Sequence, residues 1–133
     1  MWKAKSIVYA VILTLSISLA CSSQSSDPKV YADSADTVSV KMGERFKIAL
    51  ESNPSTGYGW RFVSDVDSSL LKLMEHQYIA KPNPEKVVGR GGHDEWLFEA
   101  IAAGSTSVAL EYLRPWDSTS VEREVEFQIF IGE

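Results

Sequence analysis

The chain has 133 residues, of which 44% are hydrophobic and 23% charged, a composition typical of one globular domain rather than a disordered protein. Its formal net charge is −5, and because the first twenty residues hold Lys3 and Lys5 but no acid, the remainder carries −7. An acidic domain without a basic cluster argues against nucleic acid and anionic membrane surfaces as partners.

Residues 1–20 have the pattern of an export signal. Lys3 and Lys5 form a positively charged start, and the apolar stretch 7–19 that follows is shorter than a bilayer span requires. We therefore expect an exported protein whose first segment is removed.

Cys21, the only cysteine, follows this segment directly. The residues 18–21, SLAC, resemble a bacterial lipobox, which implies that Cys21 is lipid-modified and becomes the first residue of the mature chain. The next residue is Ser22 rather than an aspartate, which in lipoproteins of this type implies the outer membrane of the cell envelope. The alternative is an ordinary cleaved signal with an unpaired cysteine. Residues 21–34 are rich in Ser and Asp and predict a flexible tether to a domain at 35–133.

Within that domain, apolar residues recur mostly at a spacing of two, which is the period of half-buried β-strands. The inward-facing sets are Val38 and Val40; Phe46, Ile48 and Leu50; Tyr58, Trp60 and Phe62; Leu71, Leu73, Glu75, Gln77 and Ile79; Trp96, Phe98 and Ala100; Val108, Leu110 and Tyr112; and Val125, Phe127, Ile129 and Ile131. The set that starts at Leu71 alternates least regularly. Turn residues separate the sets, so the sequence predicts an all-β, immunoglobulin-like antiparallel β-sandwich of about seven or eight strands.

Successive connections in an antiparallel sandwich alternate between its two ends. Counting strands in order places residues 53–58, 81–94 and 114–120 at one end, and the plainer turns at 42–44, 64–69 and 102–105 at the other. Immunoglobulin-like domains build binding surfaces from loops that share an end in this way.

The first of these loops reads Asn53-Pro54-Ser55-Thr56-Gly57-Tyr58. Pro54 restricts its own φ and keeps Asn53 out of the helical region, while Gly57 can adopt a positive φ and close a tight turn. We expect the hydroxyls of Ser55 and Thr56 on a stiff tip that suits a narrow cleft. Taken alone, the motif favours a plain hairpin loop, because turn chemistry of this kind is common.

The other two loops contain Gly89-Arg90-Gly91-Gly92 and Arg114-Pro115-Trp116. Glycines allow the backbone of a partner to approach closely. Trp116 at a loop tip is typical of an interface anchor, with a tryptophan folded back onto the sandwich as the alternative. Arg114 is expected to pack within its own loop.

These three motifs, in this order, resemble the signature loops of the chagasin family of cysteine protease inhibitors. The resemblance extends from about Thr37 to the C-terminus, and Trp60 and Tyr112 fit it as well. Ser55 departs from it, because the family usually has threonine there.

The resemblance implies a reversible, non-covalent inhibitor of papain-like cysteine proteases that acts as a monomer and needs no cofactor. The tip formed by Ser55 and Thr56 would enter the active-site cleft, the pair Gly91 and Gly92 would lie along one side of it, and Trp116 would pack on the other side. The lipid anchor would be the only contact with a membrane.

Two other functions are open from the residues alone. An enzyme would need a nucleophile beside a base, but the only cysteine is at the expected anchor, and His76 and His93 are both expected to face solvent. His93 and Asp94 could orient each other, although no nucleophile motif accompanies them and no metal-ligand spacing occurs. The second alternative is an envelope or adhesion lipoprotein that uses the same loops for another ligand.

Overall fold

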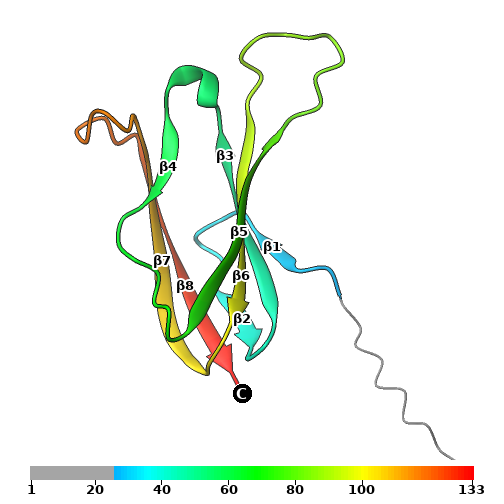
Figure 1. Ribbon diagram of the computed structural model, residues 1–133, viewed down its shortest axis with the longest axis vertical. Helices are drawn as coiled ribbons and strands as arrows, with labels where there is room; N and C mark the ends of the chain where they lie inside the picture. The colour runs from blue at the N-terminus through cyan, green and yellow to red at the C-terminus, as the bar shows by residue number, and fades with distance from the viewer. Residues whose placement is uncertain (1–25) are drawn as a thin grey trace, which may run out of the picture.

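The computed structural model describes residues 26–133, which form two four-stranded β-sheets packed face to face (Figure 1). The strands are β1 Lys29–Tyr31, β2 Val38–Lys41, β3 Arg45–Ser52, β4 Gly59–Phe62, β5 Leu71–Ala80, β6 Gly92–Ala100, β7 Gly104–Leu113 and β8 Arg123–Gly132. The predicted β-sandwich is confirmed. The predicted export signal and Cys21 lie outside the described residues.

The strand order is β1-β3-β6-β5 in one sheet and β2-β8-β7-β4 in the other. All pairings among the six later strands are antiparallel, as expected. The first two strands are different, because β1 runs parallel to β3 and β2 runs parallel to β8 at the outer edge of each sheet. The chain thus adds one parallel strand to each sheet before the antiparallel part begins.

Strand β1 corrects the predicted tether, because Lys29–Tyr31 lies within the stretch expected to be flexible. Tyr31 is only 3% exposed and packs edge-on against Phe46, with ring centroids 6.2 Å apart. The ammonium of Lys29 lies 4.6 Å from the centre of the Tyr31 ring. One buried aromatic side chain therefore holds this segment in place. Strand β1 was not predicted, because three residues are too few to show a periodic pattern.

The core lies between the sheets and consists mainly of the side chains predicted to face inward. Phe46 and Phe98 stack at its centre, with centroids 5.4 Å apart, and Phe62 of the opposite sheet meets Phe98 edge-on. Fully buried residues come from both sheets: Val38, Phe46, Ile48, Leu71, Phe98, Val108, Leu110, Leu113, Phe127 and Ile129. Alternation of polar and apolar residues therefore identified the core correctly along most strands.

Strand β5 is the exception, because its register against β6 shifts between Leu73 and Glu75. Leu73 is opposite Phe98, but beyond the bulge it is His76 that is opposite Trp96, so the odd-numbered residues do not share one face. A β-bulge inserts one extra residue and thereby moves the following side chains to the other face.

The bulge also changes the predicted environment of the histidines. His76 lies flat on the Trp96 ring, with centroids 4.8 Å apart, and its Nε2 is 2.8 Å from Asp94 Oδ1. His76 is thus half-exposed but packed rather than free in solvent. The pairing of His93 with Asp94 that an enzyme could have used is not formed, because neighbouring residues of a strand point to opposite faces. Asp94 pairs with His76 instead, and His93 Nε2 lies 3.9 Å from Glu95 Oε2.

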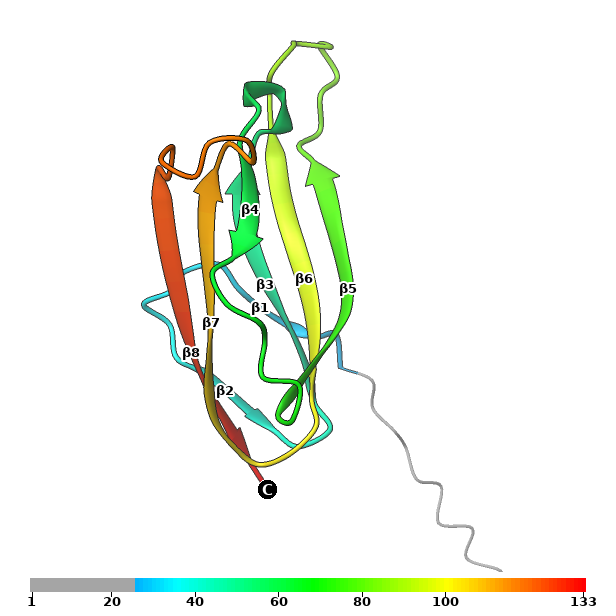
Figure 2. The same cartoon turned by 60° about the vertical axis from the view of Figure 1, so that its left-hand side comes forward.

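The predicted division of the connections between two ends is confirmed. The β3–β4, β5–β6 and β7–β8 connections meet at one end of the sandwich, and the turns that precede β3, β5 and β7 lie at the other (Figures 1 and 2). Among residues 26–133, no helix is long and apolar enough to cross a membrane. In the same range, no group of three or more histidine, cysteine or acidic side chains is placed to hold a metal ion.

Candidate functional site

The β3–β4 loop is a closed turn whose hydrogen bonds are made within the loop itself. Pro54–Thr56 forms a single 3-10 turn, and Gly57 ends it with a φ of 80°. The Ser55 hydroxyl donates to Asn53 Oδ1 at 2.6 Å, and the Thr56 hydroxyl donates to the Asn53 carbonyl at 2.7 Å. The two hydroxyl protons are therefore used inside the turn. The Thr56 hydroxyl oxygen also accepts from the Tyr58 N–H at 3.4 Å, so the tip meets a partner mainly through its exposed surface.

Asn53 connects this tip to the rest of the domain. Its backbone N–H donates to the Tyr112 hydroxyl at the end of β7, and its side-chain amide donates to the Gly89 carbonyl of the β5–β6 loop, both at 2.9 Å. Its Oδ1 also accepts from the Ser55 N–H at 3.3 Å. Asn53 therefore positions the first two loops relative to each other, and its side chain is directed to its own neighbours.

Replacing Asn53 with alanine is expected to loosen both loops and to lower the free energy of unfolding by about 1–2 kcal/mol, because several partners lose a hydrogen bond. Amide hydrogen exchange at Ser55 should become faster, and thermal unfolding should begin earlier. Asn53→Asp is the matched control, since it keeps an acceptor for Ser55 but loses the donor to Gly89. Unchanged exchange in the alanine variant would contradict the positioning role.

In the β5–β6 loop, only part of the predicted glycine motif reaches the surface. Gly89 and Gly91 adopt positive φ values of 78° and 69°, with the exposed Arg90 between them. Gly92 is instead buried in β6, paired with Ser52 on one side and Ala80 on the other, and a Cβ there would collide with the neighbouring strand. Gly92 therefore allows the neighbouring strands to pack closely, and it is poorly placed to contact a partner.

Two residues of this loop were missed in the sequence argument. Val87 is 51% exposed and Val88 is 94% exposed. The Asn83 side chain holds the loop here, donating to the Val87 carbonyl at 2.7 Å and accepting from its N–H at 2.9 Å. The sequence feature that could have identified them is the occurrence of two adjacent β-branched apolar residues in a loop rich in Pro and Gly. Exposed apolar side chains on a braced loop suit a contact surface.

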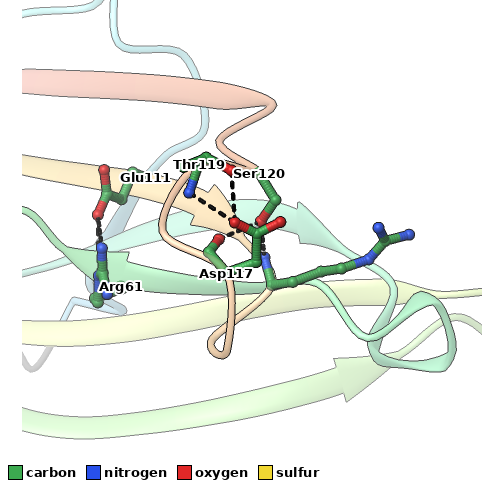
Figure 3. Close-up of polar contacts among 6 residues, drawn as sticks. Arg61, Glu111, Asp117, Thr119 and Ser120 are labelled. Carbon is green, nitrogen blue, oxygen red and sulfur yellow. Dashed lines mark hydrogen bonds and ion pairs between the residues drawn. The ribbon is translucent and has the colours of Figure 1, made fainter.

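The β7–β8 loop is held by a second polar turn (Figure 3). Asp117 Oδ1 accepts from the Thr119 N–H at 3.0 Å and from its hydroxyl at 2.6 Å. The Ser120 hydroxyl donates to the Asp117 carbonyl at 2.6 Å and accepts from the Arg114 N–H at 2.8 Å. Beside the loop, Arg61 pairs with Glu111 across β4 and β7 (Figure 3).

This polar turn carries Trp116, whose side chain is not folded back onto the sandwich. Trp116 is 74% exposed. The far edge of its indole lies against Gly57, where an added Cβ would be 2.7 Å from Trp116 Cη2. The first and third loops are therefore in contact, and Gly57 is needed both for its positive φ and for the space that the indole occupies.

The turn at Asp117 is expected to loosen in acid. The hydrogen bonds from Thr119 lower the pKa of Asp117 below its ordinary 3.8, with a smaller contribution from the charge of Arg114. A lowered pKa means that the ionised carboxylate stabilises the turn above the ordinary value, and that this contribution is lost as the pH falls through the lower, folded-state pKa. Exchange of the Thr119 amide should become faster over that acidic range. An Asp117→Asn variant should show no such acid dependence, and a pH-independent wild type would contradict the assignment.

Under the loops, arginine and aromatic side chains form a continuous stack. The Arg114 guanidinium lies 4.6 Å from the Tyr58 ring centre, Tyr58 stacks on Tyr112 at 5.5 Å, and Arg123 lies 4.5 Å from Tyr112. Arg123 also donates to the Glu51 carbonyl at 2.9 Å. Arg114 thus packs on the first loop rather than within its own. Arg123 belongs to no recognisable motif, so its place in this stack was not predictable from the sequence. Such stacks stiffen the base of the loops.

Three kinds of comparison bear on this arrangement. The model of the chagasin family peptidase inhibitor I42 matches residues 39–131. Chagasin of Trypanosoma cruzi is 34% identical over 103 residues, which cover 75% of this chain and 91% of that protein. Amoebiasin-2 of Entamoeba histolytica is 32% identical over 81 residues, which cover 61% and 64% of the two chains.

Solved structures show the same fold. The crystal structure of the cysteine protease inhibitor EhICP2 from Entamoeba histolytica superposes with a TM-score of 0.64 at 23% identity, covering 80% of this chain and 98% of that one. The structure of PbICP-C in complex with falcipain-2 gives a TM-score of 0.55 at 18% identity, covering 78% and 90%.

Proposed function

The chain belongs to the chagasin family of peptidase inhibitors, and on this basis we propose that it is a reversible, non-covalent inhibitor of papain-like cysteine proteases. The observation that carries the proposal is the convergence of three braced loops at one end of the sandwich (Figure 2). This end has an exposed tip at Thr56, the exposed Val88 and the exposed Trp116. The family consists of inhibitors, so the chain is not an enzyme.

The geometry supports occlusion of a cleft rather than presentation of a substrate. The turn at Pro54–Thr56 is closed by the hydrogen bond from the Gly57 N–H to the Pro54 carbonyl, 3.1 Å long, so its backbone is not extended for attack by a nucleophile. We place the Thr56 tip in the active-site cleft, with Val88 and Gly91 along one side and Trp116 on the other. Interfaces between proteases and their protein inhibitors typically bury roughly 800 Å² per partner.

Both loops beside the tip are held by contacts that do not involve a partner. Asn53 fixes the β5–β6 loop, and the stack from Arg114 to Arg123 fixes the β7–β8 loop. A surface that is already ordered loses less conformational entropy on binding, which favours tight association. This is consistent with an inhibitor that works by shape and by the exclusion of substrate.

A titration of papain with the purified protein tests the proposal. An inhibitor should abolish papain activity at a stoichiometric ratio, and activity should return on dilution because no covalent bond forms. No inhibition at micromolar protein would refute the proposal and favour the adhesion lipoprotein.

We also propose that the protein is a monomer, exported and anchored in the bacterial cell envelope, at its outer membrane, through a lipid on Cys21. In the described part of the chain, Lys29 is opposite Phe46 near the start of β3, at the end of the sandwich remote from the three loops. An anchor preceding β1 would therefore leave the loops directed away from the membrane. Cys21→Ala should release the protein from membranes and prevent palmitate labelling, and light scattering should give the mass of one chain.

A further inference from the structure

Charge is distributed unevenly between the loop end and the rest of the domain. We define the loop end as residues 51–58, 81–92 and 114–123. It carries five basic and four acidic side chains, a formal net charge of +1, while the other described residues carry six basic and fourteen acidic ones, a net charge of −8. An approaching molecule therefore meets a strongly negative body with one end that is slightly positive.

Four of the five basic residues of this end line an open pocket of about 480 Å³ between the loops. Its lining includes four basic residues, Lys81, Arg90, Arg114 and Arg123, and two acidic ones, Glu51 and Glu122. Glu51 is already paired with Lys81 at 3.1 Å. Arg90 is exposed and forms no hydrogen bond or ion pair with any described residue, so its charge is available to a partner.

We propose that the target proteases carry acidic residues around the rim of their active-site cleft, and that the basic loop end recognises this rim. The inference rests on the proposed inhibitor function, and it narrows the expected targets to papain-like proteases with an acidic cleft rim. A protease with a basic rim would gain little from the loop end, whereas the net charge of −8 on the rest of the described residues would disfavour approach of an acidic rim from other directions. Complementary charge of this kind acts mainly on the association rate and on the orientation of the encounter.

The test measures association rate constants for a papain-like protease with an acidic cleft rim, and for a variant of it in which those acids are replaced by their amides. Arg90→Glu is compared with Lys41→Glu, which makes the same change in net charge on an exposed lysine of β2 at the opposite end. Each rate is measured at about 10 mM and about 500 mM salt, since the Debye length falls from roughly 30 Å to less than 10 Å over this range.

We expect Arg90→Glu to slow association by about tenfold at low salt and much less at high salt, while Lys41→Glu changes it by less than about twofold. The amide variant of the protease should associate more slowly with the wild-type inhibitor. Rates that are independent of salt, equal effects of the two substitutions, or equal rates for both proteases would each overturn the inference. Failure of the wild type to inhibit either protease would instead refute the proposed function.

Discussion

Replacing Thr56 with arginine is expected to abolish protease inhibition, raising the inhibition constant by about a thousandfold or more. Thr56 is exposed at the tip of the closed turn and lies at the point we place deepest in the cleft. A long charged side chain there must either be buried without a partner or hold the tip outside. Burying an unpaired charge costs several kcal/mol, and about 4 kcal/mol corresponds to a thousandfold. Titration of papain with the variant measures the effect.

The same substitution should leave the fold intact. The Thr56 hydroxyl makes one short hydrogen bond, to the Asn53 carbonyl, so its loss is expected to cost about 1 kcal/mol of unfolding free energy. Thr56→Ala removes that bond without adding bulk, and Thr56→Ser keeps it. If the alanine variant loses inhibition as completely as the arginine variant, the turn geometry rather than the fit of the tip is responsible. An arginine variant that inhibits normally would refute the placement of the tip.

The end of the molecule that carries the site was predictable because strand counting needs only the positions of the turns. Period-two alternation located β3, β6, β7 and β8, whose inward residues are buried. The same count gave three loops at one end even though the inward face of β5 was misassigned beyond Leu73. A bulge changes which face a side chain occupies, but it does not change the end at which a strand finishes.

What the sequence could not show is how the loops hold one another. Asn53 bonds to Tyr112 and Gly89, which are 59 and 36 positions away along the chain, and no local pattern encodes such pairings. The motif around Asn53 predicted a turn correctly, but it did not show that the hydroxyls of Ser55 and Thr56 bond to Asn53 within the turn. β1 was missed for a related reason, because its one buried residue, Tyr31, gains its packing from Phe46 of β3.

Replacing Trp116 with alanine is expected to weaken inhibition by about 2 kcal/mol or more, close to thirtyfold, chiefly through faster dissociation of the complex. The indole is 74% exposed, so much of its area is available to be buried against a protease. The substitution should change the free energy of unfolding only slightly, because the contact with Gly57 involves only the edge of the ring. Dissociation rates measured by surface plasmon resonance, together with thermal unfolding, separate the two effects.

Two further variants decide what kind of anchor Trp116 is. Trp116→Phe keeps an aromatic ring but should no longer reach Gly57, so it should retain part of the affinity if the buried area matters most. Gly57→Ala leaves the indole in the chain but displaces it, since a Cβ at that position would be 2.7 Å from Cη2, and it also strains a backbone with a φ of 80°. If binding depends on where the indole is held, Gly57→Ala should weaken inhibition nearly as much as Trp116→Ala. A loss below about 0.5 kcal/mol for Trp116→Ala, within the range of ordinary surface substitutions, would instead mean that the protease does not contact the indole at all.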